Sequence, residues 1–149
     1  LFHLPLSFTN IEWYGRGPWE NYQDRYSSAL VGYYEGKVRS QYFPYVYPQE
    51  NGNKTGVRWF SVKDDEGNGF RVVGDTLLNF SIHHYTLENL TNATHTYEIE
   101  DGAYITLNVD LAQMGVGGDD SWSPRVHPEF QLKDSVYTYS YTIYPFTNK

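Results

Sequence analysis

The residues best suited to bind a ligand lie in the stretch 115–124, which reads Gly-Val-Gly-Gly-Asp-Asp-Ser-Trp-Ser-Pro. Its glycines allow positive φ angles that other residues resist, and Asp119, Asp120 and Ser121 can tighten the turn by hydrogen-bonding nearby main-chain groups. Near the tip stands Trp122, whose indole face can cover the C–H face of a sugar ring while the ring N–H finds a polar partner. Two roles are open to this side chain: contact with a ligand, or an internal plug for its own loop.

A second group of charged residues lies near the start of the chain and comprises Arg16, Glu20, Asp24 and Arg25. Two carboxylates close in sequence can act as an acid–base pair. Neighbouring arginines, however, keep carboxyl groups ionised and unsuited to proton donation. We therefore expect these four side chains to form an ion-pair network that fixes an irregular segment.

Two other clusters invite a metal-binding hypothesis. His83 and His84 are adjacent, and adjacent side chains of a strand point to opposite faces, so the pair cannot chelate one ion together. Residues 64–69 are rich in acidic residues and glycine, but their length and spacing do not fit an EF-hand. We expect a hydrogen-bonded or surface histidine pair and an ordinary polar hairpin loop.

Composition predicts the kind of element that positions these residues. The chain has 149 residues, which indicates one domain over residues 1–149, and its 15 Tyr, 8 Phe and 4 Trp favour strands. We expect an all-β fold. A formal net charge of −7 argues against a nucleic-acid partner, and no apolar run is long enough to make the membrane a partner. The absence of cysteine excludes disulfides and thiolate chemistry.

Alternation of apolar and polar residues predicts where the strands lie. We expect strands at 11–14, 29–34, 38–43, 56–63, 70–73, 78–85, 94–98, 104–111 and 136–144, with turns at 35–37 and 74–76. Strand 104–111 leads directly into the tryptophan loop. Its apolar face is Ile105, Leu107, Val109 and Leu111, and its polar face is Tyr104, Thr106, Asn108 and Asp110. The one helix expected is short, at 86–90, with Thr86 as its N-cap.

Three irregular motifs, taken together, resemble the C-terminal domain of the large bacterial β-galactosidases of glycoside hydrolase family 2. Their order and spacing match that family across nearly all of the chain. The matching residues are Trp13 to Pro18 with Glu20, Asn21, Tyr22, Asp24 and Arg25; Pro44 to Val46 with Pro48 and Glu50 to Gly52; and Met114 to Pro124 with Glu129 and Phe130.

The resemblance implies a fold and a role. The family's last domain is an antiparallel β-sandwich, similar to the galactose mutarotase supersandwich, and it packs beside a catalytic (β/α)₈ barrel. That barrel carries two glutamates, one acid/base and one nucleophile, for a retaining hydrolysis of β-galactosides, together with an assisting Mg²⁺. None of these elements belongs to this chain, which is expected to be inactive alone and to hold no cofactor.

What the resemblance assigns to this chain is one aromatic contact. The family's last domain places a tryptophan at the mouth of the active site, where it stacks on the sugar. Carried onto this sequence, that residue is Trp122, in the motif Asp119-Asp120-Ser121-Trp122. The expected substrate-binding residues are therefore Trp122, Asp119, Asp120 and Ser121.

The match covers only the second half of the family's last domain, and the chain begins at Leu1. We therefore expect a C-terminal piece of a longer polypeptide. The expected partners are a β-galactoside substrate, the barrel and the other domains of the parent chain. Exposed sheet edges and apolar surface would also favour a homo-oligomer.

Two other functions stand as alternatives. An autonomous carbohydrate-binding module would need several exposed aromatic side chains in one groove, and the candidates are Trp19, Tyr47, Trp59 and Trp122. A mutarotase-like enzyme would need a histidine acid and a carboxylate base on one concave face. The available histidines are His83, His84, His95 and His127, and the sequence pairs none of them with a suitable acid.

Overall fold

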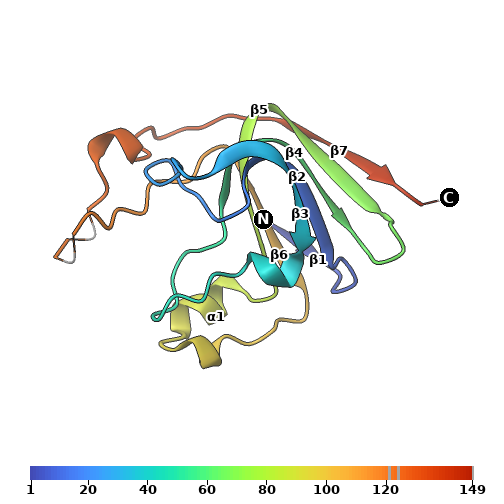
Figure 1. The fold of residues 1–149 in the computed structure, drawn as a ribbon, viewed down its shortest axis with the longest axis horizontal. Coiled ribbons are helices and arrows are strands. Elements are labelled where there is room, and N and C mark those ends of the chain that lie inside the picture. Colours follow the sequence, from blue (N-terminus) through green and yellow to red (C-terminus); the bar gives the residue numbers. More distant parts are fainter. Residues whose placement is uncertain (121, 124, 149) are drawn as a thin grey trace.

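A computed structural model describes the chain except residues 121, 124 and 149, and in it the chain is built on a single antiparallel sheet (Figure 1). The strands are β1 (Phe2–Leu4), β2 (Asn10–Gly17), β3 (Leu30–Lys37), β4 (Lys54–Lys63), β5 (Gly69–His83), β6 (Ile105–Asp110) and β7 (Tyr141–Phe146). They are ordered β1-β6-β5-β4-β2-β3, with β7 paired to β5. The prediction of an all-β, antiparallel fold is confirmed.

The sheet folds over on itself along its two longest strands. One half of β5 pairs with β7, over Gly69–Gly74, and the other half pairs with β6, over Asn79–His83. Between these halves the pairing of β4 with β5 shifts register twice, near Val57. Such bulges bend both strands at the same point.

Aromatic contacts show that the two halves of the sheet face each other. Phe80 is the register partner of Lys54, and Phe60 lies six residues further along β4, which in a flat strand is a separation of about 20 Å. The rings of Phe60 and Phe80 nevertheless stack at 4.5 Å, and Trp13 meets Phe80 edge-on at 6.0 Å. The core is therefore enclosed between the halves of one bent sheet.

The core consists of side chains from four strands, β2, β4, β5 and β6, and one short helical turn, η1 (Val38–Gln41). Burying each large apolar side chain contributes about 1.5–3 kcal/mol to the free energy of unfolding. The buried cluster comprises Ile11, Trp13, Val38, Val57, Phe60, Val62, Val72, Leu78, Phe80, Ile82, Ile105, Leu107 and Val109. The predicted apolar face of strand 104–111 supplies the last three of these residues.

The expected turn at 35–37 and the strand at 38–43 are both wrong, because β3 continues through Lys37, paired with β2. Val38–Gln41 forms a 3-10 helix, η1, that directly follows β3. Val38 is buried in the core, and the Gln41 side-chain amide donates to the carbonyl oxygen of Lys37 at 3.0 Å. This local capping bond stabilises a turn where the alternating pattern had indicated a hairpin partner.

Three other local predictions need correction. The expected turn at 74–76 lies inside β5, which continues through it with a bulge. Residues 94–98 are not a strand, because Glu98 accepts from the main-chain N–H groups of Thr94 and His95 and closes the 3-10 helix η2 (Thr96–Glu98). The last strand begins at Tyr141 rather than at residue 136.

The predicted helix is confirmed as α1 (Leu87–Asn92), capped by Thr86, whose hydroxyl accepts from the Asn89 N–H at 3.1 Å. Among the described residues, no helix has the length and apolar character needed to cross a bilayer. At one end of the strand order, β3 exposes the side chains of Leu30, Val31 and Tyr33. The expected exposure of apolar surface at a sheet edge is therefore present.

Candidate functional site

The loop that carries Trp122 lies between β6 and β7, and in Figure 1 it reaches outward from the strands, in orange. Two hydrogen bonds fasten its base. The N–H of Gly117 donates to the Asp24 carboxylate at 2.7 Å, and the N–H of Gly115 donates to the Phe130 carbonyl oxygen at 2.9 Å. These two bonds join one side of the loop base to Asp24, in the segment that follows β2, and the other side to Phe130, further along the same loop.

Glycine is required at this base for two different reasons. Gly117 has a φ of 67°, in the left-handed region that side chains disfavour. Gly115 is buried, and a Cβ there would lie 2.6 Å from the Asp24 carboxylate and 2.9 Å from Phe130. The close approach of loop and carboxylate therefore depends on the missing side chain.

The tip is shaped by the acidic residues that precede the indole. Asp120 accepts from the N–H groups of Trp122 and Ser123, both at 2.8 Å, which is the turn-tightening role expected of it. Asp119 contacts the ring nitrogen Nε2 of His127, and this hydrogen bond raises the pKa of His127 above its usual value. Ser121, the remaining predicted residue, lies outside the described residues.

The indole itself faces outward. Trp122 is 88 % exposed, so within this chain it does not plug its own loop. A bulky apolar side chain held at the tip of an anchored loop is available to a ligand or to another surface.

The three motifs that carry the family resemblance meet in space at the base of this loop. Glu20 receives hydrogen bonds from Arg25 at 2.9 Å and from the Gly52 N–H at 2.8 Å. Arg25 also donates to the Tyr45 hydroxyl at 2.8 Å. Together with the Asp24–Gly117 bond, these contacts join the first motif to the second and the third.

The predicted ion-pair network is correct for one pair and wrong for the other two residues. Arg25 and Glu20 form the expected ion pair. Arg16 instead donates to the Ala29 carbonyl oxygen at 2.9 Å and lies over the Tyr26 ring at 4.1 Å. Asp24 serves the loop at Gly117, a partner 93 positions away that no local pattern indicates.

A cavity of about 480 Å³ lies where the motifs meet, lined by Arg25, Tyr45, Glu50, Gln113 and the loop residues 114–118, among others. Its size is within the usual range of ligand pockets. Part of Glu50 remains open to solvent, yet desolvation of its carboxyl raises the pKa to about 7, with smaller contributions from Asp110 and Glu20. Sequence reasoning placed Glu50 in a motif but assigned it no role.

The two adjacent histidines line different cavities, as expected of neighbouring residues that point to opposite faces. The His83 ring is buried and stacks on Tyr85 at 4.6 Å, and its Nε2 lies 3.0 Å from the Asn51 carbonyl oxygen. Because a carbonyl only accepts, Nε2 carries the proton. Burial lowers the pKa of His83 to about 4, so the ring is neutral at pH 7.

This environment bears on the mutarotase alternative. Two histidines, His3 and His83, line one cavity with three acids, Glu50, Glu88 and Asp110. One ring nitrogen of His83 is bonded to the backbone, however, and the other, Nδ1, is buried without access to solvent. Neither nitrogen of His83 is placed to exchange a proton with a ligand in that cavity, and the His3 ring is stacked on Tyr104.

Among the described residues, no set of metal ligands supports either metal-binding hypothesis. The Asp64 carboxylate accepts from the N–H groups of Glu66 and Asn68, at 2.9 and 2.8 Å, and so closes its own hairpin loop. Within the part of the chain that the structure describes, no three His, Cys, Asp or Glu side chains gather as a metal site.

The aromatic groove of a carbohydrate-binding module is also not assembled around Trp59. That ring packs against Tyr33 at 5.9 Å and is covered by the Arg71 guanidinium at 3.9 Å. The guanidinium occupies the ring face that a sugar would need.

The fold and the anchored loop define a class: an all-β, antiparallel domain with one exposed indole on an anchored loop. Comparison with known proteins then identifies the family. The family model described as "Beta galactosidase small chain" matches residues 1–143. The chain belongs to this family.

Curated relatives agree with that assignment. The chain is 40 % identical over 146 residues to a protein named "Beta-galactosidase" from Priestia megaterium, covering 97 % of this chain and 14 % of that protein. It is 41 % identical over 145 residues to one of the same name from Photobacterium profundum, covering 97 % and 13 %. A third, from Halalkalibacterium halodurans, is 43 % identical over 133 residues, covering 89 % and 13 %. The chain thus spans about one seventh of the length of these relatives.

Proposed function

We propose that this chain is the accessory C-terminal part of a retaining β-galactosidase of glycoside hydrolase family 2, and that Trp122 completes its substrate pocket. One observation carries the proposal: the indole is 88 % exposed on a loop whose base is fastened to the rest of the domain. The relatives named "Beta-galactosidase" supply the reaction class. Under this proposal the acid/base, the nucleophile and the Mg²⁺ belong to the barrel of the parent chain.

The free energy of one stacking contact limits how tightly this domain alone can bind a sugar. By analogy with bases stacked on aromatic side chains, one indole stacked on a sugar ring contributes about 1–3 kcal/mol. A free energy of about 3 kcal/mol corresponds to a dissociation constant above about 1 mM. Trp122 is therefore expected to strengthen binding in a pocket built mainly by the barrel, and the domain alone is expected to hydrolyse no galactoside.

The experiment that tests the proposal is steady-state kinetics of the full natural chain carrying Trp122→Ala, with lactose and an aryl galactoside as substrates. KM should rise about tenfold or more, because 1.4 kcal/mol corresponds to a factor of ten. Trp19→Ala is the matched control, since Trp19 is also exposed, at 68 %, but lies outside the loop. Kinetics unchanged by Trp122→Ala, or changed equally by both variants, would refute the stacking role.

Support for oligomer assembly is the second part of the proposal. Strand β3 ends the strand order and exposes Leu30, which is 70 % accessible, beside Val31 and Tyr33. Open edges with apolar side chains pair readily. In the full natural chain, Leu30→Lys should shift sedimentation towards smaller species while leaving the melting temperature of the domain nearly unchanged. If Leu30→Lys sediments like the unmodified protein, the edge formed by β3 is not part of an oligomer interface.

A further inference from the structure

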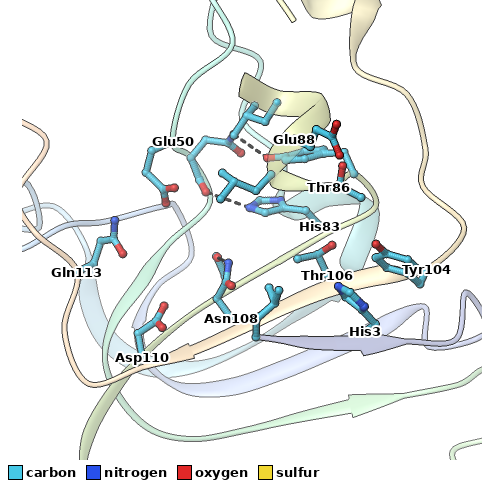
Figure 2. Close-up of a pocket in the computed structure, with 16 residues that line it drawn as sticks. His3, Glu50, His83, Thr86, Glu88, Tyr104, Thr106, Asn108, Asp110 and Gln113 are labelled. Atoms are coloured by element: carbon cyan, nitrogen blue, oxygen red, sulfur yellow. Dashed lines mark hydrogen bonds between the residues drawn. The ribbon is translucent and has the colours of Figure 1, made fainter. Parts of the chain in front are cut away.

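A second cavity, distinct from the base of the tryptophan loop, lies between the polar side of β5 and β6 and the helix α1 (Figure 2). Its volume is about 420 Å³, within the range of small-molecule pockets. In Figure 2, Asp110 and Asn108 rise from β6 into it, and Glu50 faces them from the segment that precedes β4. The polar face predicted for residues 104–110 therefore forms one wall of a cavity.

The charge of this cavity selects the class of ligand. Three carboxylic acids line it, Glu50, Glu88 and Asp110, and among its described lining side chains there is no lysine or arginine. The α-amino group of Leu1, also at its wall, is a positive charge near Asp110. His83, in the floor, is neutral at pH 7 because burial lowers its pKa. Phosphates, nucleotides and other anions are disfavoured in such a site.

Several lining side chains of this cavity have unused hydrogen-bonding capacity, most of it as acceptors. No hydrogen bond among the described residues engages the carboxylates of Asp110 or Glu88, or the side-chain amide of Gln113. The Asn108 amide uses one of its hydrogens, donating to the Ser81 hydroxyl at 2.9 Å, which leaves its carbonyl oxygen free. Carboxylates accept several hydrogen bonds, whereas amides both accept and donate, a combination that matches vicinal hydroxyl groups.

The cavity also has an aromatic element. His3 on β1 and Tyr104, which precedes β6, stack at 3.8 Å with an interplanar angle of 24°. Both line the cavity, and in Figure 2 they lie on the opposite side from Gln113. Aromatic rings beside hydroxyl-matching groups suit a ligand with one apolar C–H face.

We propose that this cavity binds a neutral polyhydroxylated ligand of hexose size, at a site separate from the one to which Trp122 contributes. A metal ion is the less suitable occupant, because no three acidic or histidine side chains of the described chain gather closely enough to hold one. The two cavities share Glu50 and Gln113 as a common wall. This inference uses none of residues 114–124. The expected total of two sugars rests on the proposed function, whereas the loss of one sugar in Asp110→Ala does not.

Equilibrium dialysis of the full natural chain against radiolabelled D-galactose and D-glucose tests the site. We expect two bound sugars per chain at saturation for at least one of the two probes, the second with a dissociation constant on the order of 1 mM. Asp110→Ala should lower the stoichiometry by one, and Glu88→Ala, on the exposed side of α1, should weaken the same site at least threefold. Asp134→Ala is the matched control, because Asp134 is an exposed acid outside the cavity.

Each outcome decides the matter. The same stoichiometry in the unmodified protein and in Asp110→Ala overturns the proposal. Binding of D-galactosamine without binding of either neutral hexose would identify a cation site and also overturn it. Galactoside hydrolysis with unchanged kcat and KM in Asp110→Ala is expected, and that assay reports on the proposed function separately. A melting curve of Asp110→Ala confirms that the variant is folded when its stoichiometry is measured.

Discussion

Removing the Asp24 carboxylate is the sharpest test of how the loop positions Trp122. Asp24 accepts from the Gly117 N–H at 2.7 Å, and its other oxygen is buried without a partner among the described residues. A hydrogen bond to a charged group contributes about 1.5–3 kcal/mol. Asp24→Ala would remove this bond, while the Gly115–Phe130 bond would still hold the other side of the loop base.

The effect on substrate binding has an upper bound. A loosened loop cannot lose more than the contribution of the indole that it carries, about 1–3 kcal/mol. That contribution corresponds to about a 5- to 160-fold change in KM. Because a loosened loop keeps part of it, we expect Asp24→Ala to raise the KM for lactose about three- to thirtyfold and never more than Trp122→Ala does, with kcat changed less than twofold. Asp24→Asn keeps a neutral acceptor at the same place, so its KM should rise less than about fivefold.

The assay is a double-mutant cycle in the full natural chain. If Asp24 acts only through the loop, Asp24→Ala should raise KM little further once Trp122 is replaced by Ala, because the group that it positions is gone. Melting temperatures of all variants show whether the domain stays folded. An equal rise in KM with and without Trp122 would refute the reasoning, since Asp24 would then act by another route.

The remaining predictions concern packing and pH. Gly115→Ala should reproduce the KM effect of Asp24→Ala, because the new methyl group would lie 2.6 Å from that carboxylate; unaltered lactose kinetics would argue against the close contact. Phe80→Ala should lower the free energy of unfolding by about 3–5 kcal/mol in urea titrations, since Phe80 is fully buried against Phe60 and Trp13; a loss below about 1 kcal/mol would contradict the bent-sheet core. Glu50 has a pKa raised to about 7 in the folded chain by desolvation, so the folded state binds more protons than the unfolded state between about pH 4.5 and 7, and stability should fall as pH rises through this window. Glu50→Gln should flatten that part of the melting-temperature profile, and a profile that keeps its slope would show that another group is responsible.

Local pattern was a good guide to element type and a poor guide to element ends. Residues 105–109 alternate so regularly that their buried face was predicted correctly, because a two-residue period fixes which side chains share a face. Residues 136–140 alternate just as regularly, yet β7 begins only at Tyr141. Alternation makes pairing possible, but pairing also requires a partner strand in register, and no property of the segment itself supplies one.

The candidate site shows the same division. The glycine-rich loop, the turn-forming Asp120 and the single large indole follow from residue types and order, because turn chemistry is local. Asp24 was expected to pair with an arginine nearby, and instead it holds a main-chain N–H far along the chain. A carboxylate can accept from an arginine or from a main-chain N–H. The tertiary path of the chain therefore determines which donor lies next to Asp24.

The amino-acid sequence by itself determined the strand-rich class, the shaped loop and the family, because these depend on periodicity, turn residues and the order of three motifs. Tertiary structure alone decided that β4 and β5 bend together, that the three motifs meet beneath the loop and that the polar face of β6 lines a cavity. The physical reason is the sequence distance over which each effect acts. Propensity and alternation act over a few residues, whereas cavities and buried hydrogen bonds arise from segments that meet only after the sheet has folded over its own core.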